Sequence, residues 1–328
     1  MDDEPGAELI LARDLSRLHY DDPAARRAAA RGELVRIRRG VYVRTERWQM
    51  LSADQRYRAF CRAVALTAGD ECVLSHDSAA ALHGLPLLGA VPRPVHVVND
   101  RSDGGASRRG VRGHVLRLDR EDVVCVDGVA VTSMRRTLID IAATSSAHSA
   151  VAMLDHALHV DRWGRARTGI DRADLLAALA ASGLGRGQVR ARTRIEFADP
   201  AAGSVLESAS RVTIAMLGLA PPQLQRTFAV PGGEADVDFY WEGVDAVGEV
   251  DGAVKYLDPE YRGGRSADRV VYDEKLREDA IRRQVRSFTR WGSREAMSVD
   301  LLRARLAPLR LPMARRRPPR EARRGGFG

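Results

Sequence analysis

Apolar and polar side chains alternate in the run ELVRIRRGVYVR, residues 33 to 44. This period of two predicts two β-strands, because successive side chains of a strand point to opposite faces. The dipeptide Arg39-Gly40 between them is typical of a tight turn. Leucines at helical spacing precede the alternation between residues 9 and 18, and Asp22-Pro23 is a typical helix start. Residues 8 to 48 are therefore predicted to form a small helical unit followed by a β-hairpin.

Arginines occupy the polar face of this predicted hairpin, with Arg36 and Arg38 on one side of the first strand. Helices followed by a basic hairpin are typical of a winged helix, which places one helix in the DNA major groove and basic side chains near phosphates. The alternative is a small helical cap whose arginines are only solvated. In the winged-helix interpretation, the residues that contact DNA are Arg36, Arg38, Arg39 and Arg44.

Short β-like runs and helical runs share the stretch from residue 51 to 199, which predicts a mixed α/β middle domain. Within it, His76 and His83 lie seven residues apart, so they share one face of a predicted helix. No third ligand is spaced to meet them, and we expect structural roles in packing or capping for both. Arg136 and Asp140, four residues apart on a later helix, are expected to form a surface pair worth roughly a few tenths of a kcal/mol.

Carboxylates outnumber basic side chains between Ser204 and Tyr256. A helix-like run with one glutamate is followed by two strand-like runs, DVDFYW and DAVGEVDGAVKY, whose acids share a strand face by the period of two. Acids beside apolar strand residues have to be hydrated, paired or given a cation. Oxygen ligands suit Mg²⁺, and a nearby lysine is able to polarise an attacking water. The residues predicted to form this site are Glu207, Asp238, Glu249, Asp251 and Lys255.

Each of these residues also has an alternative, structural role. Ser204 and Glu207 have the spacing of a capping box, in which the glutamate bonds back to the start of its helix. The strand acids are then ordinary strand-end carboxylates, and Lys255 is a surface cation. In the later charged run VVYDEKLREDAIRRQ, Lys275 and Arg277 are expected either to approach DNA phosphates or to belong to a solvated face with internal ion pairs.

Composition adds a bias toward a polyanionic partner. The 328 residues carry 52 lysines and arginines against 44 acids, a net charge of +8, and nucleic acid is the usual partner of a basic protein. Three cysteines without a CxxC pair argue against a disulfide framework or a zinc site and favour a cytoplasmic protein. No apolar run of about 18 residues predicts a membrane span, and the N-terminus lacks a signal-peptide pattern.

Three phrases of the N-terminal half resemble AbiEi-type antitoxins, the transcriptional regulators of abortive-infection toxin–antitoxin systems. They are GELVRIRRGVYVR, LSHDSAAALHGLPL and VTSMRRTLIDIA, and together they cover residues 8 to 145. This resemblance implies a DNA-binding regulator, with DNA and a cognate toxin as partners.

The C-terminal half resembles the very-short-patch-repair branch of the PD-(D/E)XK nuclease superfamily. The resemblance covers Ser204 to Glu295 and rests on Glu207, Asp238, the run EVDGAVK and the closing YDEKLREDAIRRQVRSFTRW. Two positions depart from the superfamily: Asp251 stands where its motif lysine is expected, and Lys255 stands where related sequences often have histidine.

Together the resemblances imply an α+β protein. With the hairpin pattern and the low apolar content of the C-terminus, the expected parts are a winged helix in residues 1–50, a mixed α/β middle domain in 51–199, a restriction-endonuclease-like α/β fold in 200–312, and a disordered basic tail in 313–328.

The leading functional expectation is a DNA-binding protein with an endonuclease-like domain that hydrolyses phosphodiesters with Mg²⁺ or Mn²⁺. Asp238, Glu249 and Asp251 would hold the metal, Glu207 would position a metal-bound water, and Lys255 would assist the nucleophile. The alternative is a non-catalytic regulator of the antitoxin type, which the missing motif lysine favours.

Overall fold

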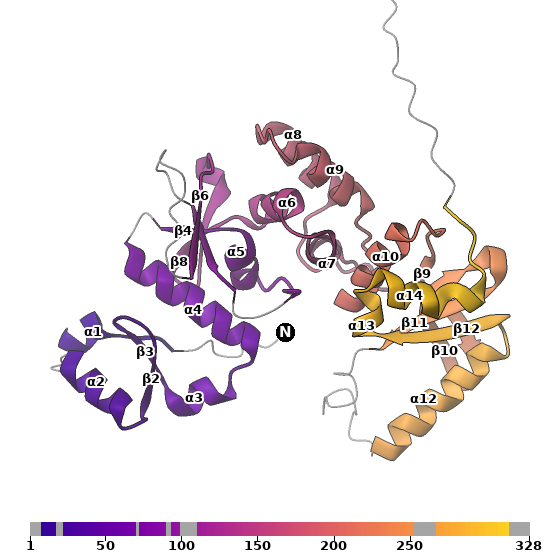
Figure 1. Cartoon of the computed structure of the whole chain (residues 1–328), viewed down its shortest axis with the longest axis horizontal. Coiled ribbons are helices and arrows are strands. Elements are labelled where there is room, and N and C mark those ends of the chain that lie inside the picture. The colour runs from indigo at the N-terminus through magenta and orange to yellow at the C-terminus, as the bar shows by residue number, and fades with distance from the viewer. Residues whose placement is uncertain are drawn as a thin grey trace, which may run out of the picture. The chain divides into compact units, whose positions relative to one another are not determined.

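The computed structural model divides the chain into two compact units, which we describe separately as unit 1 (Met1–Pro200) and unit 2 (Ala201–Gly328) (Figure 1). Both units combine helices with β-sheets. The structure describes residues 8–17, 22–69, 72–89, 93–98, 110–251 and 267–314. At the start of the predicted tail, Met313 forms a bridge with Leu219, and the tail from residue 315 lies outside the described residues.

Unit 1 begins with a small antiparallel sheet of spatial order β1-β3-β2, and two helices separate its first strand from its second along the chain. Gly40 closes the turn of the β2–β3 hairpin with a φ of 76°, a conformation that glycine adopts at little cost. The predicted hairpin is confirmed. The elements are β1 (Ile10–Leu11), α1 (Ala12–Arg17), α2 (Asp22–Ala30), β2 (Leu34–Arg38) and β3 (Val41–Arg44).

An irregular register interrupts the alternation in this hairpin. Arg36 lies opposite Tyr42 and Arg38 lies opposite Val41, so one extra residue of β2 is inserted between the two pairs. The insertion turns the two arginines to opposite faces, and the prediction that they share one face is wrong. Arg36 is exposed, whereas Arg38 is half-buried and donates from Nε to Thr67 Oγ1 at 2.8 Å.

The hairpin packs on helix α4 (Ala53–Ala68), which follows the short helix α3 (Thr45–Met50). Buried Val43 of β3 and Ala59 of α4 belong to one apolar cluster, which we call the hairpin core. Partly buried side chains from the hairpin and from the segments before and after it complete this core: Leu9, Ile37, Trp48 and Leu51.

A mixed five-stranded sheet of order β6-β5-β4-β8-β7 lies in the middle of unit 1. β5 pairs with β6 and β4 with β8 in parallel, while the other two pairs are antiparallel. Leu74, Val95 and Val131 are fully buried between this sheet and helices α4 and α5 (His76–Leu82). The strands are β4 (Val73–Leu74), β5 (Val95–Val98), β6 (Val111–His114), β7 (Val123–Val126) and β8 (Val129–Thr132).

Four of the described helices complete unit 1 around a third apolar cluster. Each contributes a fully buried side chain, namely Leu138, Leu154, Leu175 and Ile195. None of the helices that the structure describes is both long and apolar enough to cross a membrane. The elements are η1 (Arg120–Asp122), α6 (Met134–Thr144), α7 (Ala147–Leu158), α8 (Arg172–Ala181) and α9 (Gln188–Phe197).

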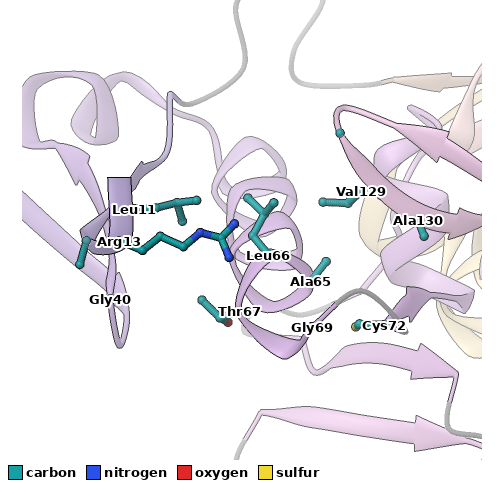
Figure 2. Close-up of a pocket in the computed structure, with 12 residues that line it drawn as sticks. Leu11, Arg13, Gly40, Ala65, Leu66, Thr67, Gly69, Cys72, Val129 and Ala130 are labelled. Carbon is teal, nitrogen blue, oxygen red and sulfur yellow. The ribbon is translucent and has the colours of Figure 1, made fainter. Parts of the chain in front are cut away.

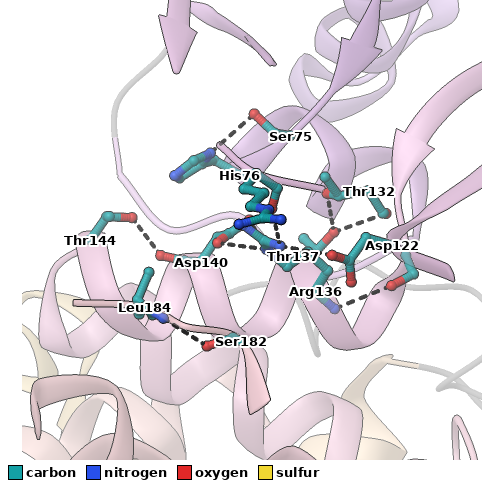
Figure 3. Close-up of polar contacts among 12 residues, drawn as sticks. Ser75, His76, Asp122, Thr132, Arg136, Thr137, Asp140, Thr144, Ser182 and Leu184 are labelled. Atoms are coloured by element: carbon teal, nitrogen blue, oxygen red, sulfur yellow. Dashed lines mark hydrogen bonds and ion pairs between the residues drawn. The ribbon is translucent and has the colours of Figure 1, made fainter. Parts of the chain in front are cut away.

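Arg136 and Asp140 of α6 form a buried ion pair, and the predicted surface pair is therefore wrong (Figure 3). Their side chains are 7% and 1% exposed, and Arg136 Nε lies 3.1 Å from both Asp140 oxygens. Arg136 Nη1 donates to Asp122 Oδ2 at 2.8 Å and to the Arg117 carbonyl at 2.9 Å. The segment that carries Arg117 and Asp122 covers this face of α6, which the helical spacing alone does not reveal.

Unit 2 is built on a four-stranded sheet of order β12-β11-β10-β9 (Figure 1). The pairs among β9, β10 and β11 are antiparallel, whereas β12 runs parallel to β11. The strands are β9 (Gln223–Val230), β10 (Gly233–Trp241), β11 (Ala246–Asp251) and β12 (Ser287–Gly292). The helices are α10 (Val205–Met216), η2 (Glu242–Val244), α12 (Ala267–Arg282), α13 (Ser293–Ala296), α14 (Val299–Leu306) and η4 (Ala307–Leu309).

Neighbouring residues of β11 face different helices, because side chains alternate along a strand. Val250 packs in a cluster with Trp291 and with Ile214 of α10, while Val247 packs with Ile281 of α12. Glu249, two residues after Val247, therefore faces the α12 side of the sheet. This places a carboxylate in a partly covered, largely apolar setting.

Candidate functional site

Glu249 is a buried carboxylate on the α12 side of the unit 2 sheet, with 5% of its surface exposed. Arg277 of α12 approaches its Oε1 with Nη2 at 3.0 Å, and Arg290 of β12 donates from Nη2 to its Oε2. Glu249 and Arg290 meet because they are paired in the register of β11 with β12. Two charge-assisted hydrogen bonds thus offset the desolvation of this carboxylate.

Arg290 joins several acids into one network. Its Nε lies 3.4 Å from Asp251 Oδ2, and its Nη1 lies 3.3 Å from Glu278 Oε2 of α12. Burial lowers the pKa of Arg290, but the hydrogen bond and the charge of Glu249, aided by the two other acids, raise that pKa above its ordinary value. We call this network the carboxylate–arginine cluster: Glu249, Asp251, Glu278, Arg277 and Arg290.

Asp238 of β10 lies next to this cluster. Its Oδ2 accepts a hydrogen bond from the Val250 N–H at 2.8 Å, close to where the pairing of β10 with β11 ends. Arg277 also reaches β10, because its Nη1 donates to the Asp236 carbonyl at 3.3 Å. The predicted metal ligands on the two strands are thus neighbours on the sheet.

Glu207 has the contacts of a helix-capping residue. The Ser204 Oγ accepts from the Glu207 N–H at 3.2 Å. The buried Glu207 carboxylate accepts from the Gly203 N–H at 2.9 Å and from Gln225 Nε2 at 2.8 Å. This resembles the predicted capping box, except that the carboxylate bonds to the residue before the cap. The contacts described for Glu207 do not include the carboxylate–arginine cluster.

The set Asp238, Glu249 and Asp251 does not fit Mg²⁺ in this arrangement. Each Glu249 oxygen is bonded to a guanidinium, and Mg²⁺ demands a near-octahedral set of oxygens. Among the described residues, these carboxylates do not bring three ligand atoms within 4.8 Å of one another. Arg277 and Arg290 supply the positive charge that a metal would otherwise provide.

Three further predicted site residues have different outcomes. Lys255 lies outside the described residues, so its predicted role stays a prediction. Lys275 is exposed on α12, which suits its predicted approach to DNA phosphates, whereas the other residue predicted there, Arg277, is bonded to Glu249.

The hairpin of unit 1 presents three exposed arginines, Arg36, Arg39 and Arg44. Beside it, a groove of about 510 Å³ opens between β1, the hairpin turn, α4 and the β7–β8 hairpin. Figure 2 shows Arg13 reaching into this groove toward Leu66. The rest of the lining is mainly small or aliphatic.

The histidines of the middle segment are arranged differently from the prediction. His83 Nε2 bonds to the Thr132 carbonyl at 2.8 Å, a structural contact. His76 instead meets His96 of β5 and His114 of β6, with one ligand atom of each within 4.8 Å of the others. The prediction considered His76 only together with His83, and it did not include the two histidines that meet His76. The signal was a histidine in each of two strand-like runs, but the parallel pairing of β5 with β6 was needed to join them.

The N-terminal segment matches one family of known proteins. Residues 6–45, which include the small sheet and its hairpin, match the family described as transcriptional regulator, AbiEi antitoxin. The match supports a DNA-binding role of the regulator or antitoxin type for this segment.

Two curated relatives extend the likeness over more of the chain. The chain is 31% identical over 216 residues to uncharacterized protein Rv2248 of Mycobacterium tuberculosis strain H37Rv, and equally to uncharacterized protein MT2308 of strain CDC 1551. The aligned part is 63% of this chain and 72% of each relative. The chain therefore belongs to the same protein family as these mycobacterial proteins.

Proposed function

We propose that the chain is a DNA-binding regulator of the antitoxin type, which contacts the DNA backbone through its N-terminal hairpin. The observation that carries the proposal is the position of Arg36, Arg39 and Arg44. All three are exposed on one hairpin, and that hairpin lies within the segment that matches the regulator family. Phosphate contacts of this kind supply sequence-independent affinity and fix the register of a protein on DNA.

In this proposal the N-terminal segment acts as a winged helix. The helix α2 directly precedes the hairpin and carries two exposed arginines, Arg26 and Arg27. It would enter the major groove while the hairpin follows the adjacent backbone. A cognate toxin is the second partner that an antitoxin-type regulator would have.

Replacing Arg36, Arg39 and Arg44 together by alanine is expected to weaken DNA binding on every sequence tested. Removing one arginine–phosphate interaction should reduce the log–log slope of affinity against salt by roughly 0.9, so removing three should reduce it by about 2.7. The measurement is fluorescence anisotropy of a labelled duplex at several salt concentrations.

The control removes equal charge elsewhere in unit 1. Arg186, Arg190 and Arg192 are exposed at and before α9, and their replacement by alanine should change the slope much less. Equal slopes for wild-type protein and the folded hairpin variant would refute the proposed DNA contact.

Metal-dependent phosphodiester hydrolysis is the second candidate function. The observation in its favour is that Asp238, Glu249 and Asp251 occupy neighbouring positions on two strands. The guanidinium of Arg290 is bonded to the Glu249 carboxylate. This candidate therefore requires Arg290 to move away before an ion binds to Glu249. The resemblance of residues 204–295 to very-short-patch-repair nucleases is part of this second proposal.

A nicking assay on supercoiled plasmid separates the two candidates. Mg²⁺- or Mn²⁺-dependent nicking by wild-type protein that disappears in Asp238→Asn would establish the enzyme. The regulator proposal expects binding without nicking at any metal concentration.

A further inference from the structure

Three histidines from separate elements of unit 1 form what we call the three-histidine cluster: His76 at the start of α5, His96 of β5 and His114 of β6. Two hydrogen bonds hold the start of α5 against β5 at this point. The Ser75 N–H donates to the His96 carbonyl at 3.0 Å, and the His96 N–H donates to Ser78 Oγ at 2.8 Å. The positions of these residues are therefore fixed by secondary structure and do not depend on a loop.

The imidazole rings lie in direct contact. His96 Nδ1 and His114 Nε2 are 2.8 Å apart, and the rings of His76 and His114 stack with centroids 3.8 Å apart. His76 and His96 are buried, whereas His114 is partly exposed and leaves an access route for a small ion. His76 has a φ of 49°, an uncommon conformation outside glycine, and such residues concentrate at functional sites.

The electrostatic setting keeps these rings neutral. Burial is the main cause that lowers the pKa of His76 to about 2 and that of the other two histidines to about 4. A neutral imidazole has one nitrogen lone pair for a metal. Of the charged neighbours, Arg112 and Arg136 oppose a cation, whereas Asp77 beside His114 favours one. Asp122 and Asp140 offset the charge of Arg136.

We propose that the three-histidine cluster binds a first-row transition metal ion, with Zn²⁺ as its typical occupant. Zinc takes imidazole nitrogens in tetrahedral geometry, and three histidines leave a fourth position for water or another ligand. Imidazole also suits Co²⁺, Ni²⁺ and Cu²⁺, whereas Mg²⁺ and Ca²⁺ require oxygen ligands. The site uses neither the hairpin arginines nor the carboxylates of unit 2, so it stands apart from the proposed DNA binding.

Ser75 is the residue that would orient His76. Its Oγ lies 3.1 Å from His76 Nδ1 (Figure 3). When Nδ1–H donates to this oxygen, Nε2 carries the lone pair for the metal, and metal-bound histidines usually have such a partner. Tetrahedral zinc holds its nitrogens about 3.3 Å apart, given Zn–N bonds of about 2.0–2.1 Å. Binding therefore requires the His96 and His114 rings to separate slightly from their 2.8 Å contact.

The test uses the full chain after treatment with a chelator. Co²⁺ is titrated and followed by its visible absorption, and Zn²⁺ affinity is measured by competition with a chromophoric chelator. We expect one ion per chain and a Co²⁺ spectrum of the four-coordinate type. Ser75→Ala removes an orienting contact and should weaken affinity roughly 10–100-fold, and the double variant His96→Gln/His114→Gln should lose the site.

His83→Gln is the matched control, because His83 lies at the other end of α5 and bonds to a carbonyl. Its metal affinity should equal that of wild-type protein. Circular dichroism checks that each variant folds, and if the double variant does not fold, His114→Gln replaces it, since His114 is the most exposed ligand. Absence of binding to wild-type protein at micromolar Zn²⁺, or unchanged affinity in the folded ligand variant, would overturn the proposal.

Discussion

Replacing Arg136 by alanine is expected to lower the free energy of unfolding of unit 1 by about 3–5 kcal/mol. The substitution leaves Asp140, 1% exposed, and Asp122 without their guanidinium partner. It also removes the donor that serves the Arg117 carbonyl. An unpaired buried carboxylate costs far more than an exposed one, since no water replaces the missing hydrogen bonds. Chemical denaturation of the full chain, followed by circular dichroism, measures the change.

The neighbouring Arg135 provides a control on the same helix. It is 46% exposed and lies 3.9 Å from an exposed Glu121 carboxylate, so Arg135→Ala should change stability by less than about 0.5 kcal/mol. The double variant Arg136→Met/Asp140→Leu should recover part of the loss, because a paired buried charge is often replaceable by apolar side chains. A loss below about 1 kcal/mol for Arg136→Ala would contradict the buried network.

The size of this loss should depend on pH. Burial raises the pKa of Asp140 from 3.8 to about 6, even though Arg136 opposes the shift. A carboxyl whose folded-state pKa is raised binds its proton more tightly in the folded state, so its contribution to stability falls as pH rises from about 4 through 6. Without Arg136 that pKa should rise further. The loss should therefore be larger at pH 8, where Asp140 is charged, than at pH 5, where it is protonated.

The second large effect is expected at Arg290. Arg290→Ala should destabilise unit 2 by about 3 kcal/mol or more, because Glu249 then keeps Arg277 as its one ion-pair partner among the described residues, while Asp251 and Glu278 each lose a partner. Arg277 and Arg282 remain beside Glu249 and Glu278, but two guanidinium groups offset the repulsion among the three acids less completely than three do. Thermal melting of the full chain gives the measurement, and the unit 2 transition should move to lower temperature.

Two comparisons sharpen this prediction. Arg303→Ala removes an exposed pair with Asp300 in the same unit and should have a small effect. Millimolar Mg²⁺ should raise the melting temperature of Arg290→Ala more than that of wild-type protein, because a cation that binds only the folded state stabilises it. An equal response of both proteins would show that Arg290 does not take the place of a metal.

Local patterns predicted the hairpin well, because alternation and a turn dipeptide act over a few residues. The bulge in β2 was not visible in that pattern, and it separated two arginines that alternation places together. The pair Arg136 and Asp140 was found by its spacing, but its strength depends on the segment around Asp122 that covers it. The spacing of residues along a helix predicts which side chains meet, but it does not predict which neighbouring segment shields them from water.

The two clusters were hidden for a related reason. His96 and His114 are separated by 18 residues and meet only through a parallel strand pair. Glu249 and Arg290 are 41 residues apart and meet through the register of β11 with β12. The sequence indicated that the acids required hydration, ion pairing or a cation, and only the register revealed that arginine fulfils this role. Sequence identifies such strands but not their neighbours.

The hairpin core determines how much of the chain has to be inherited together with the segment that matches the regulator family. The regulator-type segment ends at residue 45, yet its apolar cluster is completed by Trp48, Leu51 and Ala59, which follow it in the chain. A gene fusion that transferred only residues 6–45 would expose Val43 and Ile37 to water and leave Arg38 without Thr67. The segment that has to be transferred as a whole, in a natural gene fusion or in protein engineering, is therefore longer than the matched segment. It extends at least to the end of α4.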